Sequence, residues 1–407
     1  VAVMDQFHST EHVSGRRAVT GDARRITPPV PAPGARQALV LAGGIALGAF
    51  EAGAFAALHA ANGGAPDWIA AASIGAVNAA IIAGNPPGDR IVALRRFWDL
   101  TATDPTPVTT AMLGPPPLSG AWRRAYNDAA VLRALIFGRP GLFRPQAMLG
   151  VGTAPALYDL APLIDHLAAC VDFDRLNSTG PRLTLVATDV VNGERVTFDT
   201  AHGMRIGPEH VAASGALLPL FAPVAIDGRL FADGGLASNT PLDLVMDEPG
   251  EGALQCLVIE LFARSGSRPR FMRESIARAA DLAFSNQTLR QLEARTRKHQ
   301  LLALLNRLAE RLPPDLNDDA DSSEMLGQVR ERSRETTVVS IVYRPGPDEA
   351  APGKLFDFSR ATLTERWLAG ERGMRDALQR LARPDRATRL APGLLLHELE
   401  AGPGQVT

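Results

Sequence analysis

One serine stands where the chain is expected to turn sharply from a strand into a helix. Ser73 follows the apolar run 68–72 and precedes the helical segment 76–83, with small residues, Ala71 and Gly75, two positions away on either side. Small neighbours let strand and helix approach closely, so the turn can present the hydroxyl as a nucleophile. The N-terminal amides of the helix would then point at chemistry on this serine. The pattern is common, and by itself it indicates only a tight turn with an incidental serine.

A glycine-rich segment upstream supplies a second chemical feature. Residues 39–50 are expected to form a buried strand, a turn at Gly43 and Gly44, and the start of a helix that runs to about Asn62. Glycine amides can converge without side chains in the way, and at a helix N-terminus they can hold a phosphate or a developing oxyanion. A phosphate loop is disfavoured because no Gly-Lys-Ser/Thr follows, and the spacing fits a dinucleotide fingerprint poorly. A simple strand–helix joint is the alternative.

An aspartate ends the third segment. Asp227 and Gly228 between short alternating runs are typical of a hairpin turn, and Asp233 then stands at a strand end before two glycines. A partly desolvated carboxylate at that place can serve as a general base, because burial raises the pKa of an aspartate. Asp227 and Asp189 are weaker candidates for this role. Taken alone, Asp233 is better explained as a turn residue that caps the next segment.

The eight histidines raise the possibility of a Ser-Asp-His triad, yet none of them stands in a motif. A chain order of serine, aspartate and histidine would require His299 or His397. His299 lies in a basic run that is expected on a solvated helix face, and His397 lies in the expected tail. We therefore predict structural or solvent-exposed roles for all eight. No grouping has the spacing of metal ligands, so neither a metal nor another cofactor is expected.

The order and spacing of the three segments resemble the patatin-like phospholipase family. That family combines a glycine-rich loop, Gly-x-Ser-x-Gly, and Asp-Gly-Gly/Ala followed by Asn-x-Pro. The matching positions here are the loop at Gly43, the turn at Ser73, and Asp233 with 239–241. Two further stretches resemble the family's central strand and the region before its aspartate: 183–193 and 211–223. The resemblance covers roughly 37–245.

This resemblance implies a three-layer α/β/α fold with a mostly parallel central sheet, and a lipid acyl hydrolase that needs no metal. It assigns Ser73 as the nucleophile and Asp233 as its partner in a Ser-Asp dyad. The oxyanion hole is assigned to backbone amides of Gly43, Gly44 and Ile45. The expected substrates are phospholipids or other acyl lipids, whose ester bonds would be cleaved through an acyl-enzyme.

Three residues depart from the family's pattern. Ala71 replaces the first glycine around the serine, Ile45 replaces a third loop glycine, and Leu47 replaces the basic residue usual before the last loop glycine. A positive backbone φ at Ile45 would strain the turn, although backbone amides survive any change of side chain. Two alternatives stay open: a lipid- or partner-binding scaffold without turnover, and an acyltransferase that passes the acyl group to an alcohol.

The composition argues against several other classes of protein. The 407 residues carry a net charge of -2, which gives no case for nucleic-acid binding. Cys170 and Cys256 are the two cysteines, which favours a reducing compartment. No apolar run of about twenty residues predicts a transmembrane helix, and no secretory core is recognised near the start. We expect a cytoplasmic protein, and peripheral contact with a lipid surface and the oligomeric state stay open.

Changes in composition predict the domains. Residues 1–36 are polar and proline-rich and should form a disordered arm, and 37–265 should form the catalytic domain. Residues 266–396 should form a helical extension with an added strand, followed by a tail at 397–407. The extension resembles one found in a bacterial subset of patatin-like proteins, which assigns it no catalytic residue.

Two segments have more than one interpretation. The loop-rich insertion 101–148, with Trp122 and Phe143, is equally a lid or acyl-chain wall and a surface insertion with its own small core. The amphipathic, arginine-rich stretch 272–312 has the character of a helix on an anionic lipid surface. Such a face more often packs on the protein's own core, and we expect that here.

Overall fold

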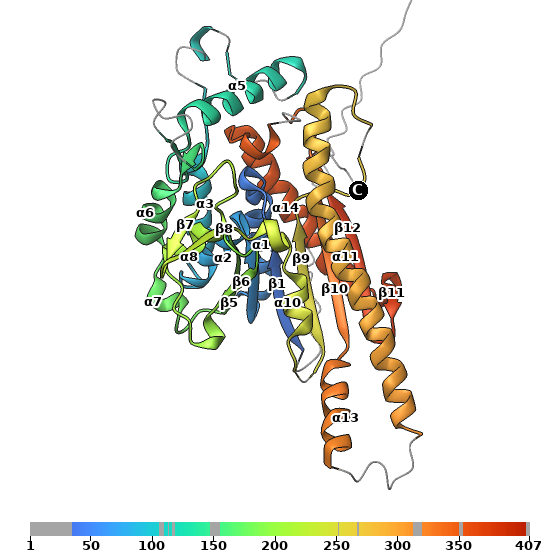
Figure 1. The fold of residues 1–407 in the computed structure, drawn as a ribbon. Helices are drawn as coiled ribbons and strands as arrows, with labels where there is room; N and C mark the ends of the chain where they lie inside the picture. The colour runs from blue at the N-terminus through green and yellow to red at the C-terminus, as the bar shows by residue number, and fades with distance from the viewer. Residues whose placement is uncertain are drawn as a thin grey trace, which may run out of the picture.

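The structure is a computed structural model in which one mixed sheet of ten strands runs through the molecule (Figure 1). It describes residues 35–105, 110–112, 114–115, 119–146, 155–250, 252–266, 268–311, 320–349 and 353–403. Nearly all of the predicted arm at 1–36 lies outside the described residues, and so does part of the insertion at 101–148.

The sheet is parallel through its centre and antiparallel at both sides. Its strand order is β11 (Thr388–Ala391), β12 (Leu394–Ala401), β10 (Thr336–Tyr343), β9 (Leu254–Glu260), β1 (Arg36–Leu41), β2 (Trp68–Ala72), β5 (Arg182–Asp189), β8 (Arg229–Asp233) and β7 (Val224–Ile226), and β6 (Arg195–Asp199) also pairs with β5. The run from β12 to β5 is parallel throughout, whereas β6, β7, β8 and β11 are antiparallel to their partners. The predicted mostly parallel sheet is confirmed.

Helices cover both faces, because alternate residues of a buried strand point to opposite sides. Leu39 and Leu41 of β1 join one core, and Ala38 and Val40 join a second. The first core includes residues of α1 (Gly48–Asn62), α2 (Ile74–Ala83), α3 (Arg90–Thr101), α5 (Ala121–Phe137), α6 (Ala161–Cys170), α7 (Phe173–Leu176), α8 (Pro208–Ser214) and α14 (Arg360–Leu381). The second includes residues of α10 (Leu242–Asp247) and α11 (Met272–Ala309). The α/β/α layering predicted from the family resemblance is confirmed.

The C-terminal region belongs to the same sheet. Three strands, β10, β11 and β12, extend the sheet beyond β9, so the prediction of a single added strand is wrong. The predicted tail from residue 397 is also wrong, because β12 continues to Ala401 with an alternating burial pattern. Gly393, with a φ of 73°, lies in the turn between β11 and β12. Because a glycine is typical of a break between elements, the sequence predicted a tail where the structure has a tight turn.

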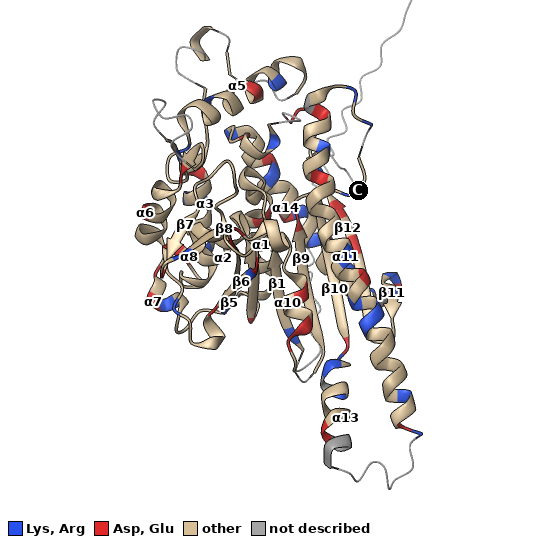
Figure 2. Ribbon diagram, in the orientation of Figure 1, with Lys and Arg blue, Asp and Glu red and all other residues tan. Residues whose placement is uncertain are grey.

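Helix α11 pairs with α13 (Ala320–Arg332), and the two extend past the sheet (Figure 1). Basic residues recur along α11 (Figure 2). Leu292 and Leu302 are buried, as packing on the protein's own core requires, but the same helix exposes Leu301, Leu304, Leu305 and Leu308. Among the described residues, no helix combines the length and the apolar character needed to cross a membrane.

Candidate active site

Two strand ends bring Ser73 and Asp233 together on one edge of β5. Ala72, the last residue of β2, lies opposite Val186, and Asp233, the last residue of β8, lies opposite Ala187. Strand β6 pairs with β5 at both of these positions, so β2 and β8 share the other edge. Because β2 runs parallel and β8 antiparallel to β5, their carboxyl ends meet.

The two side chains are buried next to each other. Ser73 is 6% exposed and Asp233 is 2% exposed. The Asp233 carboxylate accepts a hydrogen bond from the Gly235 amide, with an N–Oδ1 distance of 2.6 Å, and lies close enough to the Ser73 side chain for that side chain to lower its pKa. Burial raises the pKa of Asp233 to about 6, against the opposing effects of the Ser73 side chain and the Gly235 amide. The carboxylate is therefore a stronger base than an exposed aspartate while it is still largely ionised at neutral pH.

The backbone turns sharply at Ser73, as predicted. Its φ is 54° and its ψ is -125°, a conformation that non-glycine residues rarely adopt. A side chain at Gly75 would place Cβ 2.7 Å from the Leu41 carbonyl oxygen, so only glycine lets α2 pass this close to β1. Ala71 is fully buried between Leu41 and Leu185 of the neighbouring strands, so β2 accommodates its methyl group.

Ser214 holds both strand ends, and no sequence pattern predicted this role. Its buried hydroxyl accepts a hydrogen bond from the Ser73 amide at 3.0 Å and donates one to the Val186 carbonyl at 2.6 Å. Its own carbonyl accepts hydrogen bonds from the amides of Ser73 and Gly234, both at 3.1 Å. The sequence offered one indication of this role, because Ser214 lies within the stretch 211–223 that resembles the family.

The glycine turn, residues 43–47, lies directly beside the serine. A Cβ added to Gly43 would lie 2.8 Å from the Ser73 Cβ. The Gly43 amide, however, donates to the Asn239 carbonyl at 3.1 Å, so it is not free to stabilise an oxyanion. The prediction that the amides of Gly43, Gly44 and Ile45 all stabilise the oxyanion is therefore wrong for Gly43, and the amides of Gly44 and Ile45 remain as candidate donors.

The predicted strain at Ile45 is confirmed. Its φ is 50°, in the left-handed region that disfavours β-branched residues. The turn is closed by a hydrogen bond from the Leu47 amide to the Gly44 carbonyl at 3.0 Å, which forms the short helix η1 (Ile45–Leu47). Leu47 is fully buried in the core, where a basic side chain would be costly.

Helix α11 reaches the segment that follows Asp233. The Gln287 side chain accepts a hydrogen bond from the Asn239 amide at 2.8 Å and donates one to the Gly235 carbonyl at 3.2 Å. The Asn239 side chain in turn donates to the Gly43 carbonyl at 3.3 Å. The C-terminal region therefore contacts the surroundings of the site.

The two histidines that a triad would require, His299 and His397, are not part of the described site. The predictions that His299 lies on a solvated helix face and His397 in a tail are both wrong. His299 and His397 are both buried, and burial lowers the pKa of each. His397 is on β12, and β10, β9 and β1 separate that strand from β2. With about 4.8 Å between neighbouring strands, the separation is on the order of 19 Å. The weaker aspartates also have other roles, since Asp227 turns the β7–β8 hairpin and Asp189 pairs with Arg229 at 2.7 Å.

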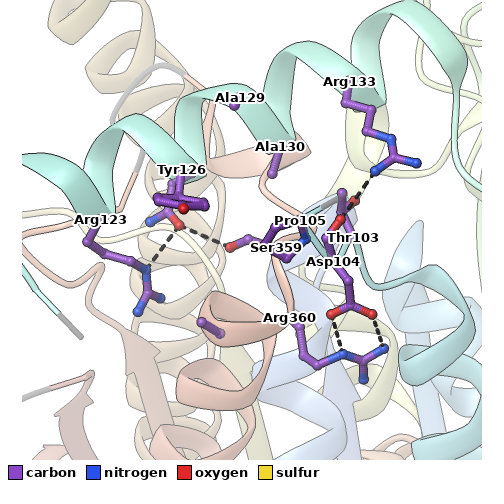
Figure 3. A pocket seen from close by; sticks show the side chains of 12 residues that line it. Thr103, Asp104, Pro105, Arg123, Tyr126, Ala129, Ala130, Arg133, Ser359 and Arg360 are labelled. Atoms are coloured by element: carbon purple, nitrogen blue, oxygen red, sulfur yellow. Dashed lines mark hydrogen bonds and ion pairs between the residues drawn. The ribbon is translucent and has the colours of Figure 1, made fainter. Parts of the chain in front are cut away.

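The described part of the insertion has both buried and exposed aromatic residues. Phe143 is 3% exposed and packs against Tyr158 and Phe221, whereas Trp122 on α5 is 67% exposed. A cavity of about 370 Å³ separates α5 from the start of α14 (Figure 3). Its lining residues are Thr103, Asp104, Pro105, Arg123, Tyr126, Asn127, Ala129, Ala130, Arg133, Ser359, Arg360 and Ala361, a set without Ser73 or Asp233.

Comparisons with known proteins identify the family. A family model described as patatin-like phospholipase matches residues 39–246, and a second, described as patatin phospholipase, matches residues 282–391. No curated protein matches the chain. Among solved structures, VipD from Legionella pneumophila is similar, with 15% identity, a TM-score of 0.34, and coverage of 85% of this chain and 67% of VipD. The first family model spans half of the chain, which therefore belongs to the patatin-like phospholipases, a family of lipid hydrolases.

Proposed function

We propose that this protein hydrolyses carboxylic ester bonds of phospholipids or other acyl lipids through a Ser73–Asp233 dyad. The observation that carries the proposal is the burial of these two neighbouring side chains at the strand ends where β2 and β8 meet. A serine hydroxyl is activated when a base lies within hydrogen-bonding reach of its proton. The proposal assigns this role to Asp233, without a histidine.

In the first half-reaction, the Ser73 oxygen attacks the ester carbonyl carbon while its proton passes to the Asp233 carboxylate. The tetrahedral intermediate collapses, the bond to the alcohol oxygen breaks, and Asp233 returns the proton to the departing alkoxide. In the second, a water molecule adds to the acyl carbon as Asp233 accepts its proton. Collapse of this intermediate returns the proton to the Ser73 oxygen and releases the carboxylic acid.

The oxyanion of each intermediate would be stabilised by the amides of Gly44 and Ile45. The proximity of the glycine turn to Ser73 and the start of α1 directly after it support this assignment, since a helix N-terminus favours negative charge. An amide donor that is fixed before the reaction typically contributes about 10²–10³ in rate.

Exposed apolar residues on α5, a helix linked to the glycine turn through the short helix η4 (Lys354–Phe356), support a lipid substrate. The exposed large apolar residues of α5 are Trp122, Leu132, Leu135, Ile136 and Phe137. Helix α5 packs on η4, and η4 packs on η1 of the glycine turn. Exposed apolar residues grouped on one element often mark a contact surface, so we assign α5 to contact with lipid during turnover.

Labelling by a fluorophosphonate tests the proposal, together with acid release from a short p-nitrophenyl ester. The wild-type protein should be labelled at Ser73 and should release acid, whereas Ser73→Ala should do neither. A wild-type protein that is not labelled and releases no acid would indicate a binding scaffold. Transfer of the acyl group to an added alcohol in preference to water would indicate an acyltransferase.

A further inference from the structure

A buried arginine of the C-terminal region hydrogen bonds to the glycine turn. Arg366 on α14 is fully buried, and its Nη1 donates to the carbonyl oxygens of Ala46 at 2.9 Å and Asp357 at 3.2 Å. Its Nη2 donates to the Lys354 carbonyl at 2.8 Å, and Nε and Nη2 donate to the Glu349 carboxylate at 3.3 and 3.4 Å. A guanidinium has five donor hydrogens, and these five contacts can use them all.

Two peptide units connect this guanidinium to a proposed oxyanion donor. The Ala46 carbonyl, which accepts from Arg366, shares a peptide unit with the Leu47 amide. That amide donates to the Gly44 carbonyl at 3.0 Å, and the Gly44 carbonyl shares a peptide unit with the Ile45 amide. Hydrogen bonds in such a chain polarise one another. A positive charge at one end therefore makes the Ile45 amide a better donor to negative charge at the other.

The hydrogen bond from Arg366 to Ala46 also helps to hold the strained turn in its conformation. Ile45 has a φ of 50°, and a non-glycine residue keeps such a conformation only where its surroundings impose it. Arg366 fixes the carbonyl of the next residue, Ala46.

The helix that carries Arg366 is itself held firmly against α1. A Cβ added to Gly370 would lie 1.9 Å from the Phe50 carbonyl oxygen, and one added to Gly53 would lie 2.0 Å from the Trp367 carbonyl oxygen. The backbones of α14 and α1 are therefore in direct contact at Trp367 and Gly370, just after the arginine.

We propose that Arg366 is a positioning residue for the reaction: it holds the glycine turn in the conformation that stabilises the oxyanion and polarises the Ile45 amide. The inference rests on the proposed esterase function. It gives the region matched by the second family model, residues 282–391, a part in catalysis, because Arg366 lies within it.

The test compares Arg366→Met and Arg366→Lys with Arg139→Met, using kcat and KM for a soluble short-chain p-nitrophenyl ester. Arg139 is a matched control because it is buried and donates to the carbonyls of Thr101 and Ala102 at 2.9 and 2.7 Å. Thermal unfolding of each variant reports the structural cost that the two methionine substitutions share.

We expect Arg366→Met to lower kcat about 100-fold, the cost of one misplaced oxyanion donor, with KM changed by less than about threefold. Arg366→Lys keeps the positive charge but lacks the planar fork of donor hydrogens of the guanidinium, so it should retain more of kcat than Arg366→Met. Arg139→Met should lower the unfolding temperature while kcat stays within about threefold of wild type.

A folded Arg366 variant with wild-type kcat would overturn the inference alone, and so would an equal loss of kcat in Arg139→Met. If only Arg366→Lys folds, a kcat loss of about tenfold at unchanged KM supports the inference and wild-type kcat overturns it. Absence of Ser73 labelling in the wild-type protein would instead overturn the esterase function, and the inference with it.

Discussion

Ser73 and Asp233 lie beside each other because two strands of opposite direction end on the same edge of β5. Side chains alternate between the two faces along a strand, so a shift of either strand by one residue would turn its side chain away from the other. Ser214 links both strand ends through its hydroxyl and its carbonyl. The predictions for the dyad and for the pH dependence of activity follow from this arrangement of Ser73 and Asp233.

The first prediction concerns the dyad. Ser73→Ala should lower kcat by on the order of 10³ or more, because no other nucleophile takes its place. Asp233→Asn should cost nearly as much, since an amide cannot accept the proton, and the two losses should not add. Initial rates on a p-nitrophenyl ester measure both. A folded His210, His299 or His397 variant that is as inactive as Ser73→Ala would contradict the dyad.

The second prediction concerns the pH dependence of activity. Burial raises the pKa of Asp233 to about 6, and the residue can act as a base only when it is ionised. The value of kcat/KM should therefore rise with pH through about 6 and level off above it, and it should fall on acidification as the carboxylate is protonated. A profile of kcat/KM between pH 4 and 9 checks this. Activity that is highest at pH 4 to 5 would show that another group limits the reaction.

The third prediction concerns stability. The folded-state pKa of Asp233, about 6, lies above the ordinary value of 3.8, so the folded protein holds this proton more tightly than the unfolded chain does. Ionisation of Asp233 should therefore reduce the free energy of unfolding as pH rises from about 4 to 6, by about 3 kcal/mol for a two-unit shift. Asp233→Asn should be more stable than wild type at pH 8 and similar at pH 4. Urea unfolding at both pH values measures the difference, and an advantage confined to low pH would contradict the assigned shift.

The fourth prediction concerns the strained turn. Ile45→Gly removes the side chain that disfavours a φ of 50°, so activity should rise or stay unchanged. Ala46→Gly is the matched substitution at the next position, which lies outside the positive-φ region, and it should bring no gain. Esterase rates and unfolding temperatures of the two variants make the comparison. A large loss of activity in folded Ile45→Gly would show that strain does not limit the turn.

The fifth prediction concerns the insertion. Replacement of the exposed Trp122 by serine should reduce turnover on phospholipid vesicles more than on a soluble ester, because α5 presents apolar residues to solvent. Met325→Ser on α13 removes a similarly exposed apolar side chain at the opposite end of the molecule and is the control (Figure 1). Equal losses on both substrates would argue for a merely structural insertion.

The buried Phe143 has a different expected outcome from Trp122. Its ring packs against Tyr158 and Phe221, so Phe143→Ala should cost about 3–5 kcal/mol of stability and affect both substrates alike. Chemical unfolding measures this cost. The sequence gives Trp122 and Phe143 the same expected role in the insertion, because hydrophobic character alone does not distinguish a core position from a surface position.

Local chemistry in the sequence determined the features that depend on a few neighbouring residues. Small residues around Ser73 predicted its sharp turn, Asp227 and Gly228 predicted the β7–β8 hairpin, and isoleucine at position 45 predicted strain. Each of these follows from backbone sterics within one or two residues of the position concerned. The alternation of apolar segments with turns likewise predicted the central parallel sheet.

Only the tertiary structure decided which groups meet across long stretches of chain. The partner of the Gly43 amide, the two-sided role of Ser214, the burial of His397 in β12 and the contact of Arg366 with Ala46 all join segments far apart in sequence. Hydrogen bonds and burial depend on the packing of whole strands and helices, which no local pattern encodes. The sequence therefore indicated which residues could do chemistry, and the packing of α8 and α14 determined what holds them.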